Sequence, residues 1–131
     1  KNTTVFCTGE KPRNNIGDWP TCAVTSQHAS GTRAYFTAKD LRMVECADFG
    51  LMIWDAKSTG TLSNVIELLM RSKKSVVYVN KDKVFRNVGT VQELEMLVSC
   101  MSEYAKRRAD GKMHLSERIV SLKHPQTSIF T

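Results

Sequence analysis

The chain has 131 residues, of which 41% are hydrophobic and 24% are charged, and its formal net charge is +6. This length suits one domain with a single core, and the composition excludes a low-complexity or disordered chain. No apolar run approaches the roughly 20 residues of a membrane span, and no signal pattern opens the chain. We therefore expect a cytoplasmic protein without a membrane partner.

The first part of the chain predicts short strands and one helix. Thr4 to Cys7 reads as a strand, and Thr8 to Trp19 as a loop rich in Gly, Pro and Asn turn signals. Ala34 to Phe36 is expected to form a brief strand. Thr37 then has the character of an N-cap for a helix over Ala38 to Ala47.

A strand, a polar turn and a helix follow. Phe49 to Trp54 is an apolar run without alternation, which is typical of a strand buried on both faces in a parallel sheet. The run stops at Asp55, Gly60 permits a tight backbone path, and an amphipathic helix begins near Thr61. In open α/β sheets, ligands bind at the carboxyl ends of strands, and helix N-termini attract anions. We therefore expect a phosphate at this turn.

The rest of the chain predicts two strands and two helices, at Ser75 to Val79, Val84 to Val88, Thr90 to about Arg108, and Ser116 to Leu122. A turn at 81–83 separates the two strands. Thr90 and Glu93 form a capping box that opens the longest helix, and Asp110-Gly111 is expected to break it.

Strands that alternate with helices predict right-handed βαβ crossovers and an α/β fold. The expected architecture is a Rossmann-like three-layer sandwich with a mostly parallel sheet, N-terminally incomplete, in which Phe49 to Trp54 is the central strand. Residues 1–131 are expected to form one nucleotide-binding domain, with 113–131 as a peripheral helix and tail. So few strands leave an edge or face of the sheet open, which favours a homo-oligomer.

The cysteines and histidines do not indicate a metal site or a cofactor. The cysteines are widely scattered and are expected to be free thiols: Cys7, Cys22, Cys46 and Cys100. The histidines also lack metal-ligand spacing. Basic residues gather late in the chain, where Lys106, Arg107 and Arg108 close the predicted helix. Such a cluster can attract nucleic acid, although it is more often a solvated helix end.

Two segments resemble a known family. Tyr35 to Asn64 (Y-F-T-A-K-D-L-R-M-V-E-C-A-D-F-G-L-M-I-W-D-A-K-S-T-G-T-L-S-N) is similar to the conserved stretch of a bacterial family of Rossmann-like proteins. That family lies near the SLOG superfamily, the relatives of the cytokinin-activating phosphoribohydrolases once called lysine decarboxylase-like. Val5 to Trp19 resembles the strand and R-N-N loop of the same family. The resemblance covers roughly Thr4 to Val88. Family members usually carry a further N-terminal β-α unit, and the resemblance leads us to expect a fold without it here.

The resemblance implies a pocket for a nucleotide or a nucleotide-derived small molecule. The ligand-binding residues that it implies are Asp55, Ser58, Thr59, Gly60, Thr61, Asn64, Arg13, Asn14, Asn15 and Lys39. The resemblance implies that Ser58 to Thr61 binds the phosphate and that Asp55 accepts hydrogen bonds from ribose hydroxyls. Ala56 stands where the family commonly has glycine, which stiffens the turn.

One departure from the family concerns catalysis. The phosphoribohydrolases have G-T-x-x-E, whereas this chain has Asn64 at the glutamate position. An amide cannot act as a carboxylate base. The catalytic residue is therefore unassigned, with Glu67 and Asp40 as candidates.

Three function classes remain open. The first is binding or sensing of a nucleotide-derived small molecule at the turn over residues 55–64. The second is an N-glycosidic hydrolase or ribosyl-transferring enzyme of the same fold, with its carboxylate supplied by Glu67, Asp40 or Asp55. The third is a nucleic-acid or protein interaction module that uses the basic C-terminal region. Two site residues also have structural interpretations, since Trp54 can belong to the core and Asp55 can cap the turn.

Overall fold

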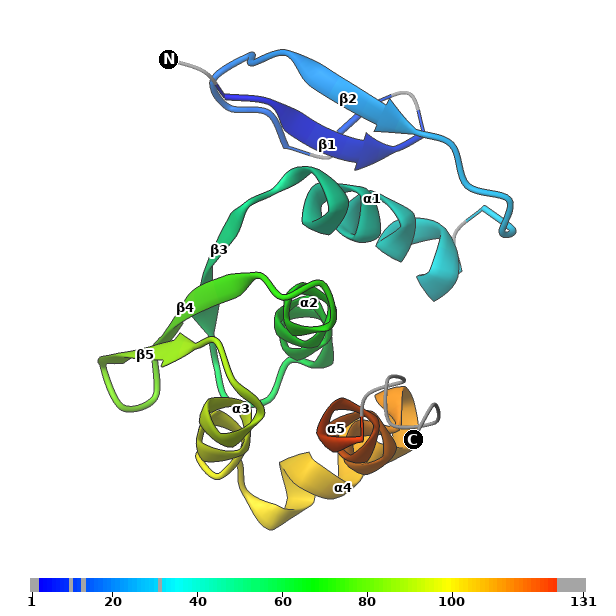
Figure 1. The fold of residues 1–131 in the computed structure, drawn as a ribbon. Helices are drawn as coiled ribbons and strands as arrows, with labels where there is room; N and C mark the ends of the chain where they lie inside the picture. Colours follow the sequence, from blue (N-terminus) through cyan, green and yellow to red (C-terminus); the bar gives the residue numbers. More distant parts are fainter. Residues whose placement is uncertain (1–2, 10, 13, 31, 125–131) are drawn as a thin grey trace. The chain divides into compact units, whose positions relative to one another are not determined.

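The structure is a computed structural model that describes residues 3–9, 11–12, 14–30 and 32–124. The chain divides into two compact units, residues 1–47 and 48–131, and each is described by itself. Strands and helices of the described residues form an α/β architecture with two sheets (Figure 1). The expectation of a single domain remains a prediction.

The first unit contains one parallel strand pair. Strand β1 (Val5–Thr8) pairs in parallel with β2 (Thr21–Val24) over their whole lengths. The predicted strand Thr4 to Cys7 is thus confirmed with a shift of one residue. The sequence analysis missed β2, because a four-residue T-C-A-V segment has neither an apolar run nor a clear alternation.

Helix α1 (Arg33–Cys46) begins earlier than expected. Its N-cap is Thr32, whose Oγ1 accepts a hydrogen bond from the Tyr35 N–H at 3.2 Å. The predictions of a strand at Ala34 to Phe36 and of an N-cap at Thr37 are therefore wrong. The Thr37 hydroxyl instead donates to the Ala34 carbonyl at 3.0 Å, as a threonine inside a helix can.

The second unit is built on a sheet with the order β3-β4-β5. Strand β3 (Phe49–Trp54) runs parallel to β4 (Lys74–Val79), and β5 (Val84–Val88) runs antiparallel to β4. The ranges of β3 and β5 agree with the sequence predictions, and β4 begins one residue before the predicted strand Ser75 to Val79. Phe49 to Trp54 was expected to be the central strand of one mostly parallel sheet. Both expectations are wrong, because β4 is central and β1 pairs with β2 in a separate sheet.

Strand β3 is also not buried on both faces. Trp54 is 1% exposed, but Phe49, Leu51 and Ile53 on the opposite face are 55%, 69% and 75% exposed. Within this unit α2 (Thr59–Met70) packs against β3 and β4, and α3 (Val91–Val98) packs against β5. Their side chains join one core, so these helices cover a single face of the sheet (Figure 1).

The predicted long helix is two helices. Helix α3 ends at Val98 and α4 (Glu103–Met113) starts after Ser102, whose Oγ accepts from the Ala105 N–H at 3.1 Å. Asp110-Gly111 does not break α4. The helix ends at Met113, its C-cap His114 has φ +54°, and α5 (Leu115–Lys123) follows directly.

The capping box is confirmed. The Glu93 N–H donates to Thr90 Oγ1 at 3.1 Å, and Glu93 Oε1 accepts from the Gly89 N–H at 2.9 Å.

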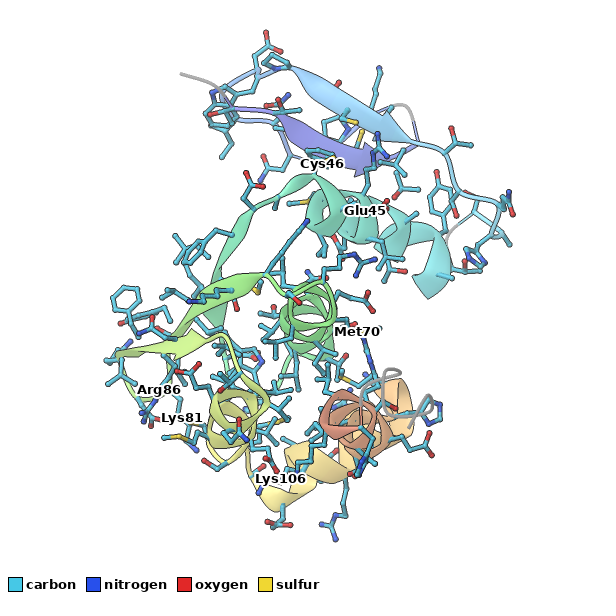
Figure 2. The ribbon with its side chains drawn as sticks, viewed as in Figure 1. Glu45, Cys46, Met70, Lys81, Arg86 and Lys106 are labelled. Carbon is cyan, nitrogen blue, oxygen red and sulfur yellow. The ribbon has the colours of Figure 1, made fainter. Side chains whose placement is uncertain are left out.

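The core of the second unit joins the sheet to all four of its helices. Its fully buried large side chains are Trp54, Leu62, Ile66, Leu68, Leu94, Leu97, Val65, Val77, Val79 and Val88. Figure 2 shows side chains filling the space between the sheet and α2, whereas Met70, at the end of α2, is exposed. This core fixes the end of β3 and the start of α2.

Candidate anion-binding site

The turn after β3 is organised by Asp55. Its Oδ1 accepts hydrogen bonds from the backbone N–H groups of Ser58 at 2.7 Å and Lys57 at 2.8 Å. The Ser58 bond is the main reason why the pKa of Asp55 lies below its ordinary value, and the Lys57 bond and charge act in the same direction. Ala56, which lies between Asp55 and Lys57, has φ +63°, a conformation that glycine adopts without strain. The turn-capping interpretation of Asp55 is thus correct.

Trp54 anchors the turn from inside the core. Its indole Nε1 donates to the Ser58 carbonyl at 3.0 Å, and the side chain is 1% exposed. A ring with no exposed face cannot stack on a ligand base. Trp54 is therefore a core residue that ties the end of β3 to the first residues of α2.

Gly60 lies inside the first turn of α2, so it does not form a tight loop before the helix. Its φ is not positive, and a Cβ added there would meet no atom within 4 Å. The expectation that Gly60 supplies an unusual backbone path is therefore wrong. Ser58 is the N-cap, and its side chain makes no capping hydrogen bond.

A cavity of about 420 Å³ opens beside this helix start. The Asp55 turn and the beginning of α2 supply part of its lining, and α4 and its N-cap supply the rest. The lining residues are Asp55, Lys57, Ser58, Thr59, Ser102, Tyr104, Ala105, Arg108 and Lys112. All of them belong to the second unit, and three of the predicted ligand residues, Asp55, Ser58 and Thr59, meet here.

The charges around the cavity favour an anion. The cavity lining includes three cations, Lys57, Arg108 and Lys112, and one carboxylate, Asp55, which is already bonded to two backbone N–H groups. Within the described part of the chain, Arg108 and Lys112 form no ion pair. The macrodipole of α2 adds partial positive charge at its N-terminus. These groups together can bind a phosphate or carboxylate.

The other predicted residues of α2 lie away from this lining. Gly60, Thr61 and Asn64 belong to the helix but are not among the residues that line the cavity. Glu67 is held in ion pairs, with Oε1 at 2.7 Å from Arg71 Nη1 and Oε2 at 2.7 Å from Arg118 Nη2. Glu67 therefore joins α2 to α5, and it is not among the residues that line the cavity at the Asp55 turn.

The predicted residues of the first unit form a second, smaller group. Asn14 and Lys39 line a cavity of about 240 Å³ beside β1. Lys39 Nζ lies 3.3 Å from Asp40 Oδ1. Asn15 uses its amide within the loop, donating to the Trp19 carbonyl at 2.9 Å and accepting from the Trp19 N–H at 3.0 Å. Arg13 lies outside the described residues.

The sequence analysis did not assign Ser102, Tyr104 or Lys112 to the site, and it interpreted Arg108 as a helix end or a nucleic-acid contact. The i, i+4, i+8 spacing of Tyr104, Arg108 and Lys112 does put them on one side of a helix. Nothing in the sequence links that side to the Asp55 turn, because their proximity depends on tertiary packing of α4 against α2.

The described part of the chain includes all four cysteines. All four cysteines are free thiols. No group of three or more His, Cys, Asp and Glu side chains in this part of the chain is placed to hold a metal ion. None of the helices that the structure describes combines the length and apolar character needed to cross a membrane.

No family model, no curated protein and no solved structure matches the chain.

Proposed function

We propose that this chain binds a nucleotide or nucleotide-derived small molecule through its phosphate, at the cavity between the start of α2 and the side of α4. The observation that carries the proposal is the presence of Arg108 and Lys112, without ion-pair partners among the described residues, on a cavity that also borders the N-cap of α2. A cavity of about 420 Å³ suits a small organic ligand, because such sites measure roughly 300–1,000 Å³.

The fold context supports the same location. Strand β3, helix α2 and strand β4 form a parallel βαβ unit, and the cavity lies at the carboxyl end of β3. Ligands of open α/β sheets bind at this end of the strands. We propose on this basis, and on the resemblance of Tyr35 to Asn64, that the chain is Rossmann-like and related to the SLOG superfamily.

Calorimetric titration with nucleoside 5′-monophosphates tests the proposal. Arg108→Gln and Lys112→Gln should each weaken binding by about tenfold, since a hydrogen bond to a charged group contributes roughly 1.5–3 kcal/mol. Arg107→Gln is the matched control, because Arg107 is an exposed neighbour of the same charge outside the cavity lining. Equal losses for Arg107→Gln and Arg108→Gln would contradict a defined site and favour the nucleic-acid alternative.

The enzyme alternative has one supporting observation. Asp55 is the carboxylate on the cavity wall, and its negative charge at neutral pH can stabilise a developing oxocarbenium ion. Release of free base from a bound nucleoside monophosphate, lost in Asp55→Asn, would favour an N-glycosidic hydrolase over a sensor. The homo-oligomer expected from the sequence remains a prediction.

A further inference from the structure

Tyr104 is an exposed aromatic residue on the cavity wall that the core does not explain. Its side chain belongs to the first turn of α4 and is 67% exposed. Within the described residues, its hydroxyl has no hydrogen-bond partner and its ring contacts no other aromatic ring. A large aromatic side chain that is exposed beside a cavity, with its hydroxyl and ring uncommitted to the described residues, is available to contact a ligand.

The position of Tyr104 relative to the cations is regular. Tyr104, Arg108 and Lys112 are spaced four residues apart on α4, and all three line the same cavity. Each step of four residues advances about 6 Å along a helix. Tyr104 thus lies at one end of the stripe, Arg108 in the middle and Lys112 at the other end. Ala105, also on the wall, is small and leaves room beside the ring.

The chemistry of this stripe matches a ligand with two different parts. An aromatic ring offers a stacking surface to any nucleobase, whereas a guanidinium and an ammonium bind phosphate oxygens. Inorganic phosphate or a sugar phosphate would use the cations alone and leave the ring without a function. The volume of about 420 Å³ also exceeds what a phosphate group needs.

Resting on the proposed function, we infer that Tyr104 stacks on the base of a mononucleotide whose phosphate contacts Arg108 and Lys112. Tyr104 then determines which ligands bind, because it separates nucleotides from phosphorylated molecules without a base. Stacking tolerates any base, so the side chain selects the class of ligand and not one particular nucleotide.

Paired titrations with a nucleoside 5′-monophosphate and with ribose 5-phosphate test the inference. Tyr104→Ala should weaken binding of the monophosphate by about tenfold, the effect typical of one lost stacking contact, and leave ribose 5-phosphate unaffected. Tyr104→Phe keeps the ring and should bind like the unmodified protein. Phe85→Ala is the matched control, because Phe85 is also 67% exposed and is absent from the cavity lining.

The outcomes separate this inference from the proposed function. If the unmodified protein binds both compounds equally, or if Tyr104→Ala weakens both equally, the stacking role is overturned and the phosphate site stands. The role is also overturned if Phe85→Ala has the same effect as Tyr104→Ala. If neither compound binds, both proposals fail.

Discussion

Asp55 determines how the polypeptide leaves β3 and enters α2. By accepting two backbone N–H groups, its carboxylate fixes a turn in which Ala56 takes a left-handed conformation that costs a residue other than glycine free energy. The same carboxylate borders the cavity, where its negative charge repels the anionic groups of a ligand that come close to it. Asp55 thus both fixes the turn and lines the candidate site.

The lowered pKa of Asp55 predicts a dependence of stability on pH. A carboxyl whose pKa is lower in the folded state stabilises the fold above the ordinary value of 3.8 and loses this effect as pH falls through the folded pKa. Asp55→Asn should therefore lower the melting temperature most near neutral pH. The difference from the unmodified protein should shrink below pH 3.8. Because solvent screens the exposed carboxylate, we expect the substitution to lower the free energy of unfolding by only about 0.5 kcal/mol at neutral pH.

Thermal unfolding followed by circular dichroism at a series of pH values provides the measurement. Asp82→Asn is the control, since the Asp82 side chain forms no hydrogen bond among the described residues, and its profile should follow that of the unmodified protein. A difference for Asp55→Asn that stays constant down to pH 2 would show that the charge of Asp55 does not stabilise the turn.

At the scale of the element, α2 begins in a way that can be tested at Gly60. Alanine fits this helical position without a steric contact, and it avoids the entropy that glycine loses in a helix. Gly60→Ala should therefore raise the free energy of unfolding by about 0.5–1 kcal/mol, measured by urea denaturation. Affinity for a nucleoside monophosphate should stay unchanged, because Gly60 is not on the cavity wall.

Gly50→Ala provides the contrast. A Cβ at Gly50 would lie 2.5 Å from Leu68 Cδ1 and 3.2 Å from Ser75 Cβ, so this variant should be destabilised by about 1–3 kcal/mol. Gly60→Ala could instead abolish binding without stabilising the helix. That result would show that the ligand approaches the backbone at Gly60 closely enough to exclude a Cβ.

At the scale of the whole molecule, local patterns predicted the strands of the second unit well. The ranges of β3 and β5 and the capping box at Thr90 follow from periodicity and from short-range hydrogen bonding. The same patterns could not predict that β4 is central or that β3 has an exposed face, because pairing and coverage depend on distant residues. Strand β2 was missed because its four residues carry no clear local pattern, and only its pairing with β1 across a loop defines it as a strand.

The candidate site also combines residues that a local pattern predicts with residues that only tertiary packing brings together. Asp55, Ser58 and Thr59 lie within five positions of one another, at the turn where the strand-turn-helix pattern predicts an anion. Tyr104 and Arg108 reach the same cavity from a helix more than forty positions later, and no local pattern connects them with the turn. Sequence analysis could therefore predict one wall of the cavity, whereas the wall formed by α4 required the tertiary structure.

The link between Glu67 and Arg118 joins parts of the second unit that are distant in the sequence. Arg118 donates through Nη2 to Glu67 Oε2 at 2.7 Å and through Nη1 to Ser63 Oγ at 3.0 Å, which holds α5 on α2. The Glu67 and Arg118 side chains are only 18% and 24% exposed. Such partly buried, doubly bonded pairs contribute more than an exposed ion pair does.

Glu67→Gln should lower the free energy of unfolding by about 1–2 kcal/mol, because it leaves Arg118 without a carboxylate in a partly buried position. A double-mutant cycle with Arg118→Gln, measured by urea denaturation, should give a coupling energy of about 1 kcal/mol. The matched cycle on Glu103 and Lys106 should give a value near zero, since that pair is 3.5 Å apart and Glu103 is 84% exposed. Equal coupling in both cycles would mean that the Glu67 pair adds nothing beyond surface electrostatics, and Glu67 would again be open to a catalytic role.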